Sequence, residues 1–161
     1  MIAIRTVKIF ESYEGRTQKM DTYLSEFAHY MSSRSWRFVF KSDAHLQIVV
    51  NDLDLTHLNS VTVSVYRIPN TNAYRLTVFN LTKVRDERYA EALLLCNSLN
   101  ESRYIARFSI DEDNDIAAEY TFMSQLSDGH DDMFKDYCLF YIMMLCMDID
   151  NSIVEIAELG K

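Results

Sequence analysis

Cysteine is the residue whose chemistry is easiest to test against spacing, because a thiol can act as a nucleophile, a disulfide partner or a zinc ligand. The chain has three cysteines, Cys96, Cys138 and Cys146. The last two fall on one expected helix and lie about 12 Å apart along its axis, too far for a disulfide or a shared zinc ion. Their neighbours are Leu, Met and Phe, which raise the pKa of a thiol. We expect three reduced, buried cysteines in a cytoplasmic protein, and no cysteine nucleophile.

Acidic side chains are the next candidates, because carboxylates bind calcium. The run Asp111–Asp115 begins like a calcium-binding loop, but such a loop requires glycine at its sixth position and glutamate at its twelfth. Ile116 and Phe122 stand there instead, and strands are expected on both sides. Asp148 and Asp150 fail the same test. We interpret the first run as a hairpin turn and assign no metal to either group.

Histidine and glycine complete the search for a reactive site. The four histidines are isolated, since none lies three or four residues from another histidine or a cysteine, so no local metal-binding pair is present. Gly15, Gly129 and Gly160 stand far apart. The sequence therefore contains neither the motif of a glycine-rich phosphate-binding loop nor that of a nucleophile elbow. The sequence predicts no catalytic residue, no cofactor-binding residue and no metal ligand.

The charge balance restricts the partners. Lysine and arginine total 16 and acidic residues total 24, for a formal net charge of −8. Nucleic-acid binding needs a basic patch, and the densest basic stretch, Lys83, Arg85 and Arg88, is interrupted by Asp86 and Glu87. Negative charge also disfavours an anionic membrane surface, and no secretory signal pattern is present. We expect neither nucleic acid nor membrane as a partner.

One segment has the pattern of a binding surface. From Tyr137 to Met147 the last expected helix is apolar on every face, in a run too short to span a membrane. A helix lying on a sheet needs an apolar stripe of only about 100°, so its other faces require a different cover. The methionines add adaptable side chains of the kind used at binding surfaces. The expected interaction surface comprises Tyr137, Phe140, Tyr141, Met143, Met144 and Met147.

Three kinds of cover are compatible with this pattern. The expected helix 18–33 or the N-terminal segment would cover the surface within one monomer. A second subunit would cover it in a homodimer. A client protein would cover it if the surface formed a groove. The residues themselves leave the three alternatives open.

The elements that hold these residues follow from the spacing of apolar positions. Steps of three and four predict helices, and alternation of apolar and polar residues predicts strands. The expected helices are 18–33, with Thr17 as N-cap, 84–99 and 130–158. The expected strands are 2–10, 36–40, 46–50, 61–66, 74–78, 104–110 and 116–122.

Turn chemistry joins these elements into one unit. Pro69–Asn72 and Asp111–Asp115 separate strand pairs and indicate hairpins. The chain shows no internal repeat, low-complexity tract or linker. We predict a single domain over residues 1–161 with the order (β)αββββαββα. This order predicts an α+β fold, an antiparallel sheet with helices packed on it.

Four short stretches carry a family resemblance. Residues 23–24 followed by 36–38 resemble a helix leading into a strand, and 93–100 ahead of 107–111 resemble a helix-to-hairpin signature. Over roughly residues 20–158 the chain is similar to the YbjN family, whose fold is similar to that of type III secretion chaperones. The chain departs from the family in two places. Residues 82–84 replace a proline before the second helix, and Asn114 or Asp115 replaces a turn glycine, both being tolerant of positive φ.

The resemblance implies a non-enzymatic bacterial cytoplasmic protein, a sensory or stress regulator whose chaperone-like fold binds a protein partner or peptide segment. Together with the apolar last helix, it leads us to expect an acidic, homodimeric protein-interaction module without cofactors. The alternative is a small-molecule-binding or enzymatic α+β domain with a pocket between the sheet and the C-terminal helix. That alternative requires an enclosed apolar cavity with converging polar groups.

Overall fold

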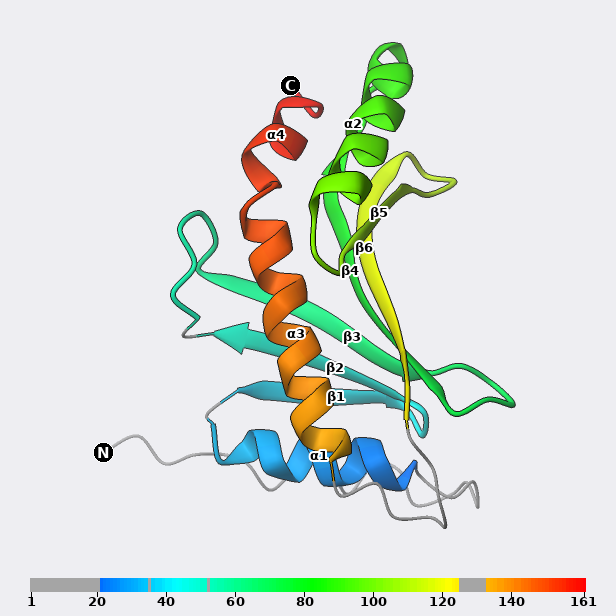
Figure 1. Ribbon diagram of the computed structural model, residues 1–161, viewed down its shortest axis with the longest axis vertical. Helices are drawn as coiled ribbons and strands as arrows, with labels where there is room; N and C mark the ends of the chain where they lie inside the picture. The colour runs from blue at the N-terminus through cyan, green and yellow to red at the C-terminus, as the bar shows by residue number, and fades with distance from the viewer. Residues whose placement is uncertain (1–20, 35, 52, 125–132) are drawn as a thin grey trace.

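The protein is built around one six-stranded antiparallel sheet with strand order β1-β2-β3-β4-β6-β5. The computed structural model describes residues 21–34, 36–51, 53–124 and 133–161. In Figure 1, α3 crosses in front of the sheet and α1 lies at its lower end. The elements are α1 (Thr22–Ser32), β1 (Arg37–Ser42), β2 (His45–Asn51), β3 (Ser60–Arg67), β4 (Ala73–Lys83), the 3-10 turn η2 (Asp86–Arg88), α2 (Tyr89–Ser102), β5 (Arg107–Ile110), β6 (Asp115–Met123), α3 (Phe134–Asp150) and α4 (Ile153–Glu158). The α+β prediction is confirmed.

The face of the sheet beneath α3 is apolar because strand residues alternate between its two faces. Register pairs Ile48 with Val63 and Val65 with Leu76, and Leu76 in turn with Tyr120. Side chains opposite one another share a face, so these apolar residues form a continuous floor. The predicted strands 46–50, 61–66 and 74–78 are therefore present as β2, β3 and β4, and their apolar residues supply the sheet half of the core.

Asparagine provides the unusual backbone conformations that glycine usually provides. Asn70, Asn80 and Asn114 have φ of 60°, 55° and 61°, a region that favours glycine but tolerates asparagine. Asn70 lies in the β3–β4 hairpin, Asn80 lies in the irregular part of β4, and Asn114 lies in the β5–β6 turn. The Asp111 carboxylate completes that last turn by accepting the backbone N–H of Asp113 and Asp115, each at 2.9 Å. The interpretation of this acidic run as a hairpin turn is confirmed.

The first helix begins later than its sequence pattern predicts. Helix α1 starts at Thr22, and its N-cap is Asp21, whose Oδ1 accepts the backbone N–H of Leu24 at 3.1 Å. The proposed cap Thr17, like the expected strand 2–10, lies outside the described residues. The boundary differs because Asp21 is held by groups far away in the chain, which a local pattern does not contain.

The last helix is divided, whereas its apolar pattern predicted one continuous helix over 130–158. Helix α3 ends at Asp150 and α4 begins at Ile153. Between them, the buried Ser152 hydroxyl donates to the Asp148 carbonyl at 2.7 Å. Such a bond from serine to the preceding turn competes with the helical ladder and bends helices.

The second helix lies further along the chain than its predicted range of 84–99. The 3-10 turn η2 precedes it, and α2 itself begins at Tyr89 and ends at Ser102. Asn100, the residue after the predicted end of the helix, pairs through its side chain with β5. Its Oδ1 accepts the N–H of Phe108 at 2.6 Å, and its Nδ2 donates to the Phe108 carbonyl at 3.0 Å. This pair ties the last turn of α2 to the edge strand.

Candidate functional site

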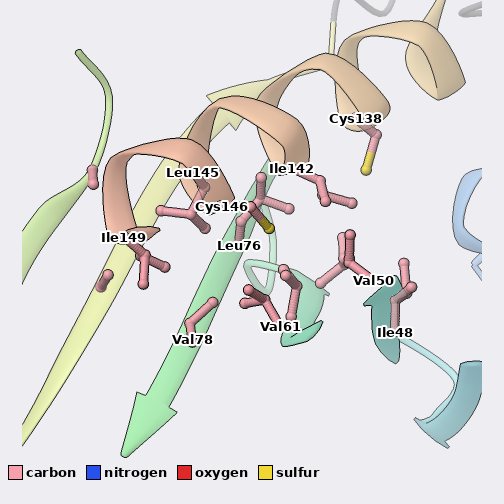
Figure 2. Packing of buried hydrophobic residues seen from close by; sticks show 14 of the residues in the cluster. Ile48, Val50, Val61, Leu76, Val78, Cys138, Ile142, Leu145, Cys146 and Ile149 are labelled. Carbon is pink, nitrogen blue, oxygen red and sulfur yellow. The ribbon is translucent and has the colours of Figure 1, made fainter. Parts of the chain in front are cut away.

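Helix α3 is anchored to the sheet through one of its sides. Its buried residues recur at steps of three and four, among them Cys138, Ile142, Leu145 and Ile149. Figure 2 shows them over Leu76 and Val78 of β4, Val61 of β3, and Ile48 and Val50 of β2. Burying each large aliphatic side chain contributes about 1.5–3 kcal/mol. This side of α3 is therefore part of the core.

The opposite side of α3 is apolar and exposed. Phe140, Met143 and Met147 are 55%, 38% and 48% exposed. Met133, just before the helix, and Val154, in α4, are each 53% exposed. Tyr137 and Met144 are half-buried between them. We call this set the α3 stripe: Met133, Tyr137, Phe140, Met143, Met144, Met147 and Val154.

Five of the six residues predicted for the interaction surface lie in the α3 stripe, and Tyr141 does not. The Tyr141 ring packs against Tyr120 and Phe122 of β6, with centroid distances of 4.7 and 5.1 Å. Burial and, next, a hydrogen bond with Tyr141 raise the pKa of Tyr120. Tyr141 therefore joins the helix to the sheet, and it supports the neighbouring Phe140 ring at 5.4 Å.

Helix α1 covers the first turn of α3 and not the stripe. The Phe134 ring lies 5.2 Å from Tyr23 and 6.5 Å from Phe27. The Lys135 ammonium lies 5.9 Å above the Tyr30 ring. Cover by α1 within the monomer, one of the alternatives from sequence, is thus confined to this end. Cover by the N-terminal segment falls on residues outside those described.

A buried carboxylate, Asp148, fixes the C-terminal end of α3 to the chain before β5. Its Oδ2 accepts the backbone N–H of Ile105 and Ala106 at 2.8 and 2.9 Å, and its Oδ1 accepts that of Tyr104 at 3.4 Å. A buried charge is costly unless it is hydrogen-bonded. The three donors supply that compensation and hold residues 104–106 against the helix.

Asp150 does the same for the loop between β2 and β3. Its two oxygens accept the backbone N–H of Thr56, His57 and Leu58 at 2.8–2.9 Å. From the sequence, both carboxylates were tested only as calcium ligands. The helix predicted there continued to residue 158, so the pattern did not place them in a last turn, where acidic side chains oppose the helix dipole and indicate specific partners.

The junction between α3 and α4 is further closed by Arg103. Its Nε donates to Ser152 Oγ at 2.7 Å, and its Nη2 donates to the Asn151 carbonyl at 3.0 Å. The guanidinium also lies 3.9 Å from the Glu155 carboxylate. These bonds satisfy helix-end groups that would otherwise be unpaired.

A second buried polar cluster lies at the start of α1. The Tyr74 hydroxyl donates to the Asp21 carboxylate, 3.1 Å from Oδ1 and 3.0 Å from Oδ2. Arg67 approaches the same carboxylate at 3.5 Å. Burial and, next, the charge of Asp21 raise the pKa of Tyr74. The cluster positions α1 on the sheet, because Asp21 is also its N-cap.

The geometry of the cysteines does not support thiol chemistry. All three are buried and free. Burial raises the pKa of the Cys146 thiol to about 12 and raises the pKa of Cys96 and Cys138 as well. A thiolate is the reactive form, so these environments disfavour nucleophilic attack. Within the described ranges, no group of three or more His, Cys, Asp or Glu is placed to hold a metal ion.

Two surface hollows are lined by residues outside α3. One, of about 970 Å³, is lined by residues 83–88 and 112–114. The other, of about 370 Å³, lies between Tyr104, Arg107 and the Glu119–Thr121 part of β6. Neither lies between the sheet and α3, where the alternative function places its pocket. Buried Leu76, Ile142 and Leu145 fill that space.

The fold and the stripe define an α+β domain whose helix α3 presents an exposed apolar side. A family model matches residues 25–133 and is described as "YbjN: Putative bacterial sensory transduction regulator". The chain belongs to the YbjN family. The matched range ends at Met133, the residue before α3.

A solved structure supports the same fold. The chain resembles the crystal structure of YbjN from E. coli, described as "a putative transcription regulator", with a TM-score of 0.54 at 12% identity. The match covers 82% of this chain and 89% of that one. No curated protein matches the chain in sequence. Among the described residues, no helix is long and apolar enough to cross a membrane.

Proposed function

We propose that this YbjN-family chain is a non-enzymatic, cytoplasmic protein-interaction module of a regulatory system. It works as a homodimer, and residues 1–161 form one domain. The observation that carries the proposal is the α3 stripe, an exposed apolar helix side on a chain of net charge −8. Neither nucleic acid nor membrane is a partner.

The supporting argument is the cost of leaving this side of α3 in water. Apolar surface removed from water contributes about 25 cal/mol per Å², and single exposed apolar residues are common. A row of them on one rigid helix is different, because contiguous exposed patches mark interaction sites. Helix α3 is rigid because the sheet and the two buried aspartates hold it.

A regulatory role is compatible with the family description, whereas catalysis finds no support in the side chains. The thiols have raised pKa values. The buried aspartates Asp148 and Asp150 are engaged with backbone N–H groups. The space beneath α3 is filled with aliphatic side chains. We therefore favour protein binding over the small-molecule alternative.

Sedimentation velocity of the full chain tests the proposal with a matched pair of variants. Phe140→Asp places a charge in the stripe, and we expect it to abolish association because a buried unpaired charge is costly. Leu94→Asp adds the same charge to the outer side of α2, at a residue 71% exposed, and should associate like the wild type. Circular dichroism checks that both variants fold.

Two results would overturn the proposal. One is a wild-type chain that stays monomeric over the whole concentration range and binds no partner through the stripe. The other is an equal effect of Phe140→Asp and Leu94→Asp, which would show that added charge alone weakens association.

A further inference from the structure

The side of β6 that faces β5 is only partly covered. Strand β5 pairs with β6 from Arg107, opposite Glu119, to Ile110, whereas β6 continues to Met123. The sequence predicts a strand over 104–110, but β5 begins only at Arg107. The reason is Asp148, whose carboxylate accepts the backbone N–H groups of residues 104–106 and holds them against α3. Among the described residues, the last part of β6 therefore has a neighbouring strand only in β4.

The ladder with β4 determines which backbone groups of β6 point to the uncovered side. Ser124 donates its N–H to the Asn72 carbonyl at 2.9 Å, in the same register as the pairs between β4 and β6. Antiparallel pairs alternate between those that exchange hydrogen bonds and those that do not, so the backbone of Phe122 also bonds to β4. The N–H and C=O groups of Thr121 and Met123 consequently point away from β4. We call these groups the β6 edge.

No described segment of the chain covers the β6 edge. Continuing the β5 register would place Ile105 opposite Thr121, but Ile105 donates its N–H to the carboxylate on α3. A surface hollow of about 370 Å³ lies there, lined in part by these two residues. The neighbouring edge of β5 is closed instead, because the Asn100 side chain pairs with both backbone groups of Phe108.

An extended peptide segment is the occupant that fits the β6 edge. Outward N–H and C=O groups recur at every second residue of a strand, and another extended backbone supplies acceptors and donors at the same spacing. We infer that the β6 edge binds an extended segment of a partner protein as an added antiparallel strand in line with β5. The inference rests on the proposed function, because it specifies the kind of segment that the protein-interaction module takes.

On the α3 face of the sheet, this segment meets aromatic side chains. The Tyr141 ring packs on Tyr120 and Phe122, at 4.7 and 5.1 Å. The Phe140 ring, 55% exposed, lies a further 5.4 Å from that of Tyr141. Side chains of an added strand alternate between the two faces. Every second residue of the segment is therefore apolar.

On the opposite face, the charges favour an acidic residue. Two arginines face one glutamate there, since Arg75 lies 3.5 Å from the Glu119 carboxylate and Arg107 stands opposite Glu119 in the register. Arg107 is exposed, and its guanidinium donates to the Ala106 carbonyl. Among the described residues, the buried Nε of Arg75 has no hydrogen-bond partner. A carboxylate opposite Thr121 would lie next to Arg107, and opposite charges on neighbouring strand positions attract.

A second copy of this chain is a poorer occupant of the β6 edge. Pairing the β6 edges of two copies would bring the side chains of Thr121 and Met123 to this face. Neither side chain carries the negative charge that complements Arg107. We therefore assign the edge to a different protein, with alternating acidic and apolar residues.

Hydrogen exchange of the full chain, measured by NMR, tests the inference with a synthetic peptide of alternating Glu and Val. In the free chain, the amides of Thr121 and Met123 should exchange faster than that of Phe122, which bonds to β4. The peptide at about 1 mM, which populates even a weak complex, should slow exchange at Thr121 and Met123 by about ten-fold or more. The amides of β1, at the other edge of the sheet, should be unaffected.

The peptide backbone supplies a matched pair of probes. In the antiparallel register, residues opposite Thr121 exchange hydrogen bonds with it, and these are the Glu residues. N-methylation of the Glu residues should weaken binding about ten-fold, because it removes the donors that face β6. N-methylation of the Val residues removes donors on the outer side and should leave binding unchanged.

Two variants of the chain test the charge. Arg107→Glu should weaken binding of the Glu–Val peptide about five-fold and favour a Lys–Val peptide instead. Arg37→Glu makes the same change at an exposed residue of β1 and should bind like the wild type. Circular dichroism checks that both variants fold.

The outcomes separate the inference from the proposed function. No protection of the Thr121 and Met123 amides, or protection of β1 amides in their place, would overturn the inference and leave the dimer to its own sedimentation test. Protection that grows with chain concentration and needs no peptide would assign the edge to a second copy and overturn the partner. An equal loss of binding in Arg107→Glu and Arg37→Glu would overturn the acidic composition. Protection by the peptide in a chain that stays monomeric would overturn the dimer and keep the edge.

Discussion

At the scale of single residues, buried aspartates have a structural role in this protein. Asp21, Asp148 and Asp150 are buried, and each accepts backbone N–H groups. Bonds from a neutral donor to a charged acceptor are about twice as strong as neutral ones, and a carboxylate can accept several at once. These residues hold together chain segments that are distant in sequence.

Replacing Tyr74 by phenylalanine tests the cluster around Asp21. The change removes the hydroxyl that donates to both carboxylate oxygens. We expect the free energy of unfolding at pH 7 to fall by about 1–3 kcal/mol, because a buried acceptor loses its partner. Urea unfolding provides the measurement. Tyr104→Phe is the control, because Tyr104 is 82% exposed and should be neutral.

The raised pKa of Tyr74 predicts a pH dependence of the free energy of unfolding, which a comparison of the wild type with Tyr74→Phe can measure. The folded-state pKa of Tyr74 is raised, so its contribution is present below the unfolded pKa of about 10 and is lost as pH rises above that value. Wild-type stability should therefore decline above pH 10 more steeply than that of Tyr74→Phe, by up to about 1.4 kcal/mol per pH unit. Identical slopes would show that the Tyr74 hydroxyl does not titrate differently in the folded chain.

At the scale of elements, α3 is fixed by packing on the sheet and by hydrogen bonds at its last turn, and its outer side is exposed. Apolar packing joins it to the sheet, and two carboxylates join its last turn to residues 56–58 and 104–106. Its outer side carries the stripe. The helix can therefore present Phe140 and Met147 at fixed spacing, which lowers the entropy cost of binding.

Asp150→Asn tests how strongly the loop after β2 depends on α3. An amide offers one acceptor oxygen and points an N–H group at backbone donors, so at least one bond is lost. We expect the free energy of unfolding to fall by about 2–4 kcal/mol. The amides of residues 56–58 should also exchange with solvent faster, as measured by hydrogen exchange.

The matched control lies in the same loop. Asp54 is exposed, and Asp54→Asn makes the same chemical change without burial, so it should alter stability by less than about 0.5 kcal/mol. If both variants were equally destabilised, the loss of net charge and not the three backbone bonds would be responsible.

At the scale of the whole molecule, the net charge of −8 opposes self-association. Two copies repel each other at long range, and salt screens that repulsion over about 10 Å at 0.1 M. The stripe itself carries no charged side chain from Tyr137 to Met147, so salt leaves its short-range contacts intact. Added salt should therefore strengthen association, because it screens the repulsion between the two copies.

Raising the salt concentration should tighten the dimer. Between about 50 and 500 mM NaCl we expect the dissociation constant to fall several-fold, because repulsion between like-charged bodies is screened. Sedimentation equilibrium at both concentrations measures it, with Phe140→Asp as the non-associating control. Weaker association at high salt would indicate an interface built on ion pairs.

Much of the fold could be predicted from local pattern. The strands over 61–66 and 74–78 and the turns that contain Asn70 and Asn114 depend on neighbours along the chain, and they appear as expected. The start of α1 and the break before α4 could not be predicted in this way, because both depend on contacts between residues that are far apart in the sequence. Asp21 meets Tyr74, and Arg103 meets Ser152.

The sequence by itself determined that this chain forms an α+β sheet domain. It also determined that the segment from Tyr137 to Met147 has more apolar surface than packing on the sheet requires. Periodicity is a local property, so it can be read before folding. Only the tertiary structure decided which side of the helix remains exposed, because that depends on where the sheet and α1 lie. It also turned Tyr141 towards β6 and left Phe140, Met143 and Met147 facing outward.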